Sequence, residues 1–347
     1  MSITQKDLAE LLSISQMTVS RCLRGASNVS ARLQEKVLAA AREHGYSLDA
    51  HYVASAMQRR RGGVRHVTNV ICAIIADDSR ESNGYHRRLL GGVCDAAAEG
   101  GSEVIVVPRM ERQFPRVVRR GQVDGVVHLP SDNLLDSGIP PCPVPWVSIL
   151  FDIPGHDAVL VDIEDSMWQI AGHLARFGHR RFAFIGPETK LGRQRLASLR
   201  RAAKECGGVL ADKFAAFCPH EKAFQQADSL VAGLVNCAAA MPALDRFTAL
   251  VAFNDIMAIG AIKGLAGKGL SVPGDISVVG LDGTERHVPP LTTAAVPLEE
   301  LGAEAARLIA WRLDYPKAPR RKHVVKTVLV EGGTTGPVSN GDKLQKE

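Results

Sequence analysis

The pattern of hydrophobic and polar positions changes once along the chain, near residue 67. Before that point, apolar residues recur every three or four positions in short stretches, which is the period of an amphipathic helix. After it, strand-length apolar runs alternate with longer segments of helical period. Such alternation is typical of parallel sheets with crossover helices. The pattern therefore predicts an all-α N-terminal head and an α/β body with parallel sheets.

Three short helices are predicted in the head, each following a residue suited to the N-cap position. The first follows Thr4, and its apolar stripe consists of Leu8, Leu11 and Leu12. The second follows Ser15, and the third follows Ser30. The inward-facing residues of these two helices are predicted to be Val19, Leu23, Leu33, Val37, Ala40 and Ala41.

The body is predicted to contain nine strands and six helices. The strands cover residues 69–76, 103–107, 125–129, 145–150, 181–185, 214–217, 249–253, 276–279 and 323–329. The helices cover residues 85–99, 164–177, 193–206, 224–236, 255–268 and 299–313.

The net charge of +5 is concentrated in the head and the segment after it. Residues 1–66 contain ten basic and five acidic side chains, whereas the two signs balance in the rest of the chain. Charge asymmetry of this kind indicates a nucleic-acid-binding head on a neutral body. A basic surface that is only solvated is the alternative.

Length and composition exclude several other classes of protein. A chain of 347 residues with 46% hydrophobic and 23% charged residues is expected to fold into two or three globular domains. Its apolar stretches, such as residues 67–76, are shorter than the roughly 20 residues that span a bilayer. The first ten residues lack the apolar run of a secretory signal, and the seven scattered cysteines form no CxxC pair. We therefore expect a cytoplasmic protein with reduced thiols and no membrane partner.

Common catalytic motifs are missing from the sequence. It contains no GxSxG nucleophile elbow and no HExxH metal site. Lys268 lacks the glycine and the Ser/Thr that complete a phosphate-binding loop. We therefore expect no catalytic residues, no metal and no cofactor.

The spacing of the first two helices matches a helix-turn-helix, in which the second helix enters the major groove of DNA. A three-helix bundle without DNA is the alternative. Residues 3–25 have the sequence ITQKDLAELLSISQMTVSRCLRG, followed by NVSAR at 28–32 and VLAAAREHGY at 37–46. These segments resemble the head of the lactose/galactose repressor (LacI/GalR) family. The resemblance implies a sequence-specific DNA-binding transcriptional regulator, with repression as its usual action.

The resemblance assigns DNA contacts to individual residues. Gln16, Met17 and Arg21 fall where the family contacts bases. Arg21 can bind guanine through two hydrogen bonds, Gln16 can pair with adenine, and Met17 can touch a thymine methyl group. The positions that contact phosphates or cap helices are occupied by Ser15, Thr18, Ser20 and Asn28.

The segment after the head departs from the family pattern. Family members follow the tyrosine with a Pro-Asn pair and a short helix whose leucine wedges into the minor groove. Here Tyr46 is followed by Ser-Leu-Asp without a proline. We expect Met57 to be the wedge, with a plain solvated tether as the alternative, and the arginines at 59–61 to bind phosphates.

The element order of the body resembles the two-lobed core shared by this family and the periplasmic binding proteins. Ligands of that fold lie between the C-terminal ends of the strands. Three motifs carry the resemblance: GHRR at 178–181 with IGP at 185–187, FNDIMAIG at 253–260, and VPGDISVVGLDG at 272–283. By this resemblance Arg195, Asn254 and Asp282 point into the cleft, where they can bind the hydroxyls of a small polar effector such as a sugar.

Two residues of the first lobe are further candidates for the same cleft. Asp152 follows the predicted strand 145–150, and Tyr85 begins the predicted helix 85–99. The alternatives are turn capping for Asp152 and packing at the helix start for Tyr85.

The predicted organisation has four parts. A helix-turn-helix domain covers residues 1–47, a hinge covers 48–66, a ligand-binding and dimerisation core covers 67–335, and a flexible tail covers 336–347. In the core, the N-lobe comprises residues 67–157 and 297–321, and the C-lobe comprises 158–296 and 322–335. A homodimer is expected to bind a pseudo-palindromic operator on double-stranded DNA. A solute-binding protein of the periplasmic type without DNA function is the alternative.

Overall fold

The head is a bundle of three helices in a computed structural model, which describes residues 5–24, 29–44, 68–75, 84–107, 113–129, 140–219, 226–285 and 288–338. Helices α1 (Gln5–Leu12), α2 (Gln16–Arg24) and α3 (Ala31–Glu43) each contribute a fully buried aliphatic residue to one small core. These residues are Leu8, Val19 and Val37.

The predicted stripe of α1 is wrong at one position. Leu11 is 53% exposed, and Ala9 is buried beside Leu8 instead. Positions 8, 9 and 12 lie on one side of a helix, and on this side α1 packs against α2 and α3. The turn to α2 passes through Ser13 in the left-handed region (φ 53°), where the amide of Ile14 donates to the carbonyl of Ala9 and ends α1.

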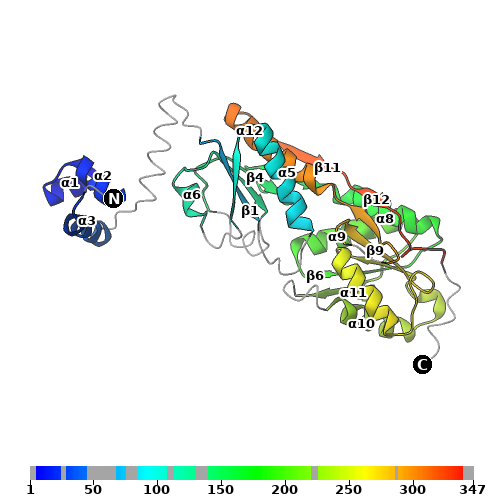
Figure 1. Ribbon diagram of the computed structural model, residues 1–347. Coiled ribbons are helices and arrows are strands. Elements are labelled where there is room, and N and C mark those ends of the chain that lie inside the picture. The colour runs from blue at the N-terminus through cyan, green and yellow to red at the C-terminus, as the bar shows by residue number, and fades with distance from the viewer. Residues whose placement is uncertain are drawn as a thin grey trace.

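The first lobe is a six-stranded parallel sheet with strand order β11-β5-β4-β3-β1-β2. Helices α5 (Tyr85–Glu99) and α12 (Leu298–Asp314) pack against each other and against one face of the sheet (Figure 1). On the other face, the short α6 (Arg116–Arg119) covers a second apolar cluster. The strands are β1 (Val70–Ile75), β2 (Glu103–Val107), β3 (Gly125–Leu129), β4 (Trp146–Ile149), β5 (Asp157–Val161) and β11 (Lys322–Val325).

The second lobe is a six-stranded sheet with strand order β12-β10-β9-β8-β6-β7, in which only the β10–β12 pairing is antiparallel. Helices α8 (Ile163–Arg176) and α9 (Lys190–Glu205) cover one face. Helices α10 (Ala227–Ala239) and α11 (Asp255–Ala266) cover the other. The strands are β6 (Phe182–Pro187), β7 (Ala215–Cys218), β8 (Ala249–Ala252), β9 (Ser277–Asp282), β10 (Thr292–Ala295) and β12 (Val328–Val330).

The predicted elements and the observed ones differ mainly where the chain crosses between the lobes. The predicted strand 323–329 is two strands, β11 in the first sheet and β12 in the second, separated at Lys326 and Thr327. Strands β5 and β10 were not predicted, because their runs are short and contain Asp157 and two threonines. Each is buried by pairing on both sides, which the local sequence does not reveal.

The predicted lobe boundaries are wrong by a few residues for the same reason. Strands β5 and β11 pair with each other in the first sheet, so residues 158–161 and 322–325 belong to the N-lobe. The three crossings between lobes therefore lie just after β5, just before α12, and between β11 and β12.

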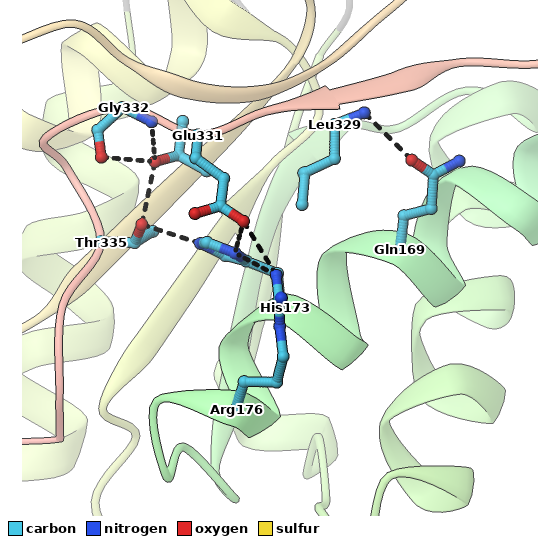
Figure 2. Close-up of polar contacts among 8 residues, drawn as sticks. Gln169, His173, Arg176, Leu329, Glu331, Gly332 and Thr335 are labelled. Atoms are coloured by element: carbon cyan, nitrogen blue, oxygen red, sulfur yellow. Dashed lines mark hydrogen bonds and ion pairs between the residues drawn. The ribbon is translucent and has the colours of Figure 1, made fainter.

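The C-terminal segment packs on α8, as Figure 2 shows for residues up to Thr335. Gln169 donates to the carbonyl of Thr327 and accepts from the amide of Leu329, both at 3.0 Å. His173 contacts Thr335 through Nε2 at 2.9 Å. The amide of Val338 donates to Phe177, so residues 336–338 belong to the packed lobe, whereas the prediction assigned them to a flexible tail.

None of the helices in the described part of the chain is long and apolar enough to cross a membrane.

Candidate functional site

Helix α2 presents two faces of opposite character. Val19, Cys22 and Leu23 are buried against α1 and α3, while Gln16, Met17 and Arg21 are exposed. Met17 is 63% exposed, which is unusual for an apolar side chain of its size. The predicted base-contacting residues therefore share one solvent-facing surface over the first two turns of α2.

The predicted phosphate-contacting residues lie at the start of the same helix. The hydroxyl of Ser15 accepts the amide of Thr18 at 3.1 Å and contacts the Thr18 hydroxyl at 2.8 Å, so Ser15 is the N-cap of α2. Ser20 is half-buried on the next turn. Asn28, the hinge 48–66 and Met57 lie outside the described residues.

Arg195 is buried at the start of α9 and points to the C-terminal ends of β8 and β9. The N-cap Thr189 begins α9, and Gly192 allows the helix to approach the backbone closely, because a Cβ there would lie 2.2 Å from the carbonyl oxygen of Pro187. The Arg195 guanidinium donates to the carbonyl of Phe253 and lies 4.3 Å from the centre of its ring. Its Nε is buried without a hydrogen-bond partner among the described residues, which leaves a donor available to a ligand.

Asp282 ends β9 opposite this guanidinium. Its Oδ1 accepts from Nη2 of Arg195 at 3.4 Å, and both side chains are at least nine-tenths buried. Its backbone has φ 106°, a conformation that a non-glycine residue adopts only when its surroundings enforce it. Burial raises the pKa of Asp282 to about 7, an effect that Asp255 reinforces and Arg195 opposes.

Asn254 and its neighbour Asp255 begin α11 beside this pair. Oδ1 of Asn254 caps the helix by accepting from the amide of Met257 at 3.0 Å, so its NH₂ group is the part available to a ligand. Asp255 is 1% exposed and accepts from the Thr293 hydroxyl at 2.6 Å and from the amide of Thr284 at 2.8 Å. It thereby fixes the turn that follows Asp282. Sequence reasoning missed this role, although Asp255 belongs to the same FND motif.

The two first-lobe candidates differ in position. Tyr85 lies at the start of α5, close enough to Asp282 and Arg195 that their charges act on its hydroxyl. Burial raises the pKa of Tyr85, Asp282 raises it further, and Arg195 opposes both. Asp152 is not in this group, because its carboxylate accepts from Arg320 and Lys322 at the start of β11.

The site between the two lobes is largely buried and offers several hydrogen-bond donors and one carboxylate acceptor. These groups belong to Tyr85, Arg195, Asn254 and Asp282. Phe253 adds an apolar ring at the same strand ends. Such a set can bind several hydroxyl groups of one small molecule. Within the described ranges, no three His, Cys, Asp or Glu residues are grouped in a way that could hold a metal ion.

Two family models match separate parts of the chain. Residues 4–48 match the model of bacterial regulatory proteins of the lacI family, and residues 171–335 match a periplasmic binding protein-like domain. The fold and the matched segments define a two-lobed binding core joined to a helix-turn-helix head.

Curated relatives extend over the full length. The regulator DegA of Bacillus subtilis is 28% identical over 98% of this chain and 100% of its own. AglR of Rhizobium meliloti is also 28% identical, over 99% of this chain and 97% of its own. Both are described as HTH-type transcriptional regulators.

Solved structures show the same fold. A CelR–cellobiose complex has a TM-score of 0.65 at 24% identity and covers 96% of this chain and 99% of its own. The lac repressor dimer bound to operator has a TM-score of 0.62 at 23% identity, covering 97% and 100%. A ribose-bound regulator from Enterococcus faecium has a TM-score of 0.62 at 24% identity, covering 78% and 100%.

The chain thus consists of a lacI-family helix-turn-helix domain followed by a periplasmic binding protein-like domain, and its full-length relatives are transcriptional regulators. It is a DNA-binding transcriptional regulator. Its head distinguishes it from the solute-binding proteins with which it shares the two-lobed core.

Proposed function

We propose that this regulator is a repressor that binds a pseudo-palindromic operator as a homodimer and is controlled by a sugar or sugar derivative held between the two lobes. The observation that carries the proposal is the buried Arg195–Asp282 pair at the strand ends of one lobe, with Tyr85 of the other lobe beside it. Cellobiose and ribose in the complexes of two proteins with this fold support a carbohydrate as the ligand.

The proposed mechanism is a change in how the lobes are held together. A ligand that contacts Arg195, Asn254 and Asp282 on one lobe and Tyr85 on the other favours the closed arrangement. It can shift DNA affinity only by its difference in affinity for the two arrangements, typically about 1–3 kcal/mol. The pocket binds without making or breaking covalent bonds, as in other regulators, and the protein acts in the cytoplasm, where its DNA is.

Arg21 is the sharpest test of the DNA-binding surface. We expect Arg21→Ala to weaken binding to a duplex selected for specific binding by about 1–3 kcal/mol, and to weaken binding to a scrambled duplex much less. Fluorescence anisotropy with both duplexes at one salt concentration measures the difference. Arg32→Ala, at an exposed position of α3, is the matched control and should leave discrimination unchanged. If the Arg21→Ala protein still preferred the selected duplex over the scrambled one as strongly as the wild-type protein does, the assignment of α2 as the recognition helix would be wrong.

Asp282 tests the pocket. In a thermal-shift screen of sugars, a ligand that binds only the native state raises the melting temperature. We expect Asp282→Ala to lose most of the shift produced by any sugar that binds, because Arg195 is then buried without its partner. Asp152→Ala should retain the shift, since that carboxylate is paired with Arg320 and Lys322 instead. If Asp152→Ala lost the shift and Asp282→Ala retained it, the effector would bind near Asp152, after β4, and the proposed pocket would be wrong.

A further inference from the structure

Arg88 connects the two lobes through a single guanidinium. It lies on α5, one turn after Tyr85. Its Nε and Nη2 donate to the two carboxylate oxygens of Glu299 at 2.6 and 2.8 Å, which joins α5 to the start of α12 within the first lobe. Its Nη1 donates at 3.1 Å to the carbonyl of Gly283, which follows β9 in the second lobe.

The acceptor of this bond is held in place independently. Gly283 has φ 70°, and a Cβ there would lie 2.6 Å from the Cβ of Ala295, so the turn is tightly packed against β10. The Asp255 carboxylate accepts the next amide, that of Thr284. The carbonyl that Arg88 contacts therefore belongs to the residue directly after Asp282, and it moves with Asp282.

The N-terminus of α5 also touches this turn directly. Gly84 precedes the helix, and a Cβ built on it would lie 3.4 Å from the Cβ of Thr284. The residues that meet across the lobes here are thus next to Tyr85 on one side and to Asp282 on the other. The Glu299 ion pair is partly exposed and adds little stability by itself, but its two hydrogen bonds hold the guanidinium in one orientation.

We propose that Arg88 is a positioning residue of the effector pocket: by binding the Gly283 carbonyl it holds Asp282 and Tyr85 in register across the closed lobes. The inference rests on the proposed function for its consequence, because the register matters only if an effector binds there. A hydrogen bond from a charged donor that is partly shielded from water gives a preference of about tenfold for the closed arrangement.

A disulfide between residues 84 and 284 measures closure without any ligand. Disulfide-bonded cysteines have Cβ atoms about 3.5–4.5 Å apart. The 3.4 Å between a Cβ built on Gly84 and the Cβ of Thr284 is close to this range, and φ at Gly84 is −110°, which a cysteine adopts freely. In the full-length Gly84→Cys/Thr284→Cys protein, treatment with diamide should form this bond quickly. Peptide mass spectrometry identifies it, and the two single variants control for pairing with the native cysteines.

The effect of Arg88 is read from the rate of this cross-link. We expect Arg88→Met to slow it about tenfold and Arg88→Lys, which keeps a charged donor, to slow it less. Arg87→Met is the matched control, at an exposed position of the same helix, and should leave the rate unchanged. Equal rates in all four proteins would overturn the proposal, as would an equal slowing by Arg87→Met. The melting temperatures of Arg88→Met and Arg87→Met are compared as a control. If they are equal, a slower cross-link in Arg88→Met reflects lost positioning and not lost stability.

Effector binding provides the second measurement, with ribose and cellobiose as the probes. If either binds, its Kd should rise about tenfold in Arg88→Met and stay constant in Arg87→Met. An unchanged Kd in Arg88→Met would overturn the positioning role even if the cross-link slowed. If neither probe binds the wild-type protein, the sugar proposal is weakened, and the cross-linking rate alone decides whether Arg88 holds the lobes together.

Discussion

Individual buried side chains in the core differ in whether their polar atoms have partners. Ser166 and Ser148 are both fully buried. The hydroxyl of Ser166 donates to the carbonyl of Asp162 at 2.5 Å and accepts from Thr327 at 2.9 Å, so it joins two of the three crossings between the lobes. The hydroxyl of Ser148 has no partner among the described residues, although it lies on β4 beside His128 of β3. Equal burial therefore has opposite consequences for stability at these two positions.

This contrast gives a matched pair of substitutions. We expect Ser148→Ala to raise the free energy of unfolding by about 0.5–1 kcal/mol, because it removes a buried polar group that gains nothing in the folded state. Ser166→Ala should lower it by about 1–2 kcal/mol, because Thr327 loses its partner. Chemical denaturation of both variants measures the difference. A destabilising Ser148→Ala would mean that a bound water satisfies this hydroxyl.

Helices α5 and α12 illustrate how small residues decide the packing of whole elements. A Cβ on Gly92 would lie 1.8 Å from the carbonyl oxygen of Glu299, and one on Gly302 would lie 2.0 Å from that of Leu89. The two backbones are therefore nearly in contact, which places Glu299 within reach of Arg88. Helical periodicity predicted both helices correctly, but it did not indicate that they pair.

Gly92 and Gly91 test this close approach. We expect Gly92→Ala to destabilise the protein by about 2–4 kcal/mol, since the added methyl group meets backbone that must move. Gly91 has no neighbouring atom within 4 Å of a built Cβ, so Gly91→Ala should be neutral or stabilising by up to about 1 kcal/mol through helix propensity. Thermal unfolding monitored by circular dichroism compares the two. Equal stabilities would contradict the packing of α5 on α12.

At the scale of the whole molecule, buried histidines link stability to pH. Burial lowers the pKa of His128 to about 4, and it also lowers the pKa of His156, His173 and His179. His173 and His179 hold the C-terminal segment through Thr335 and Gly336. The folded state thus keeps these rings neutral in a range where the unfolded chain protonates them.

The sign of the effect follows from this difference. As pH falls below about 6.5, the unfolded chain binds protons that the folded protein excludes, so stability decreases until the folded pKa is passed. For His128 the loss at pH 5 is about 2 kcal/mol, and it continues to about pH 4. The raised pKa of Asp282 acts in the opposite direction over the same range, so the prediction is a difference between proteins: from pH 7 to pH 5 the melting temperature of the wild-type protein should fall relative to that of His128→Leu. His323→Leu, at an exposed position, is the control, and an identical pH profile in all three proteins would contradict the prediction.

Features that depend on neighbours along the chain could be predicted from the amino-acid sequence. Helical period, N-caps and strand-length runs predicted the all-α head, the α/β body and most helices, because those signals repeat within a few residues. The segment from Gln16 to Arg21 and the FND motif at 253–255 indicated the proposed recognition helix and part of the proposed pocket through their resemblance to a known family. The charge excess before residue 67 separated the head from the body.

Features that join residues far apart in the chain could not be predicted from the sequence and became visible in the three-dimensional fold. Arg195 pairs with Asp282, and Arg88 binds the carbonyl of Gly283. Asp152 instead forms ion pairs with Arg320 and Lys322 and is not part of the proposed pocket. The fold also divides residues 323–329 between two sheets, since each half is buried by a different neighbouring strand. A side chain's partner depends on which strands and helices meet in space, and no local pattern along the chain contains that information.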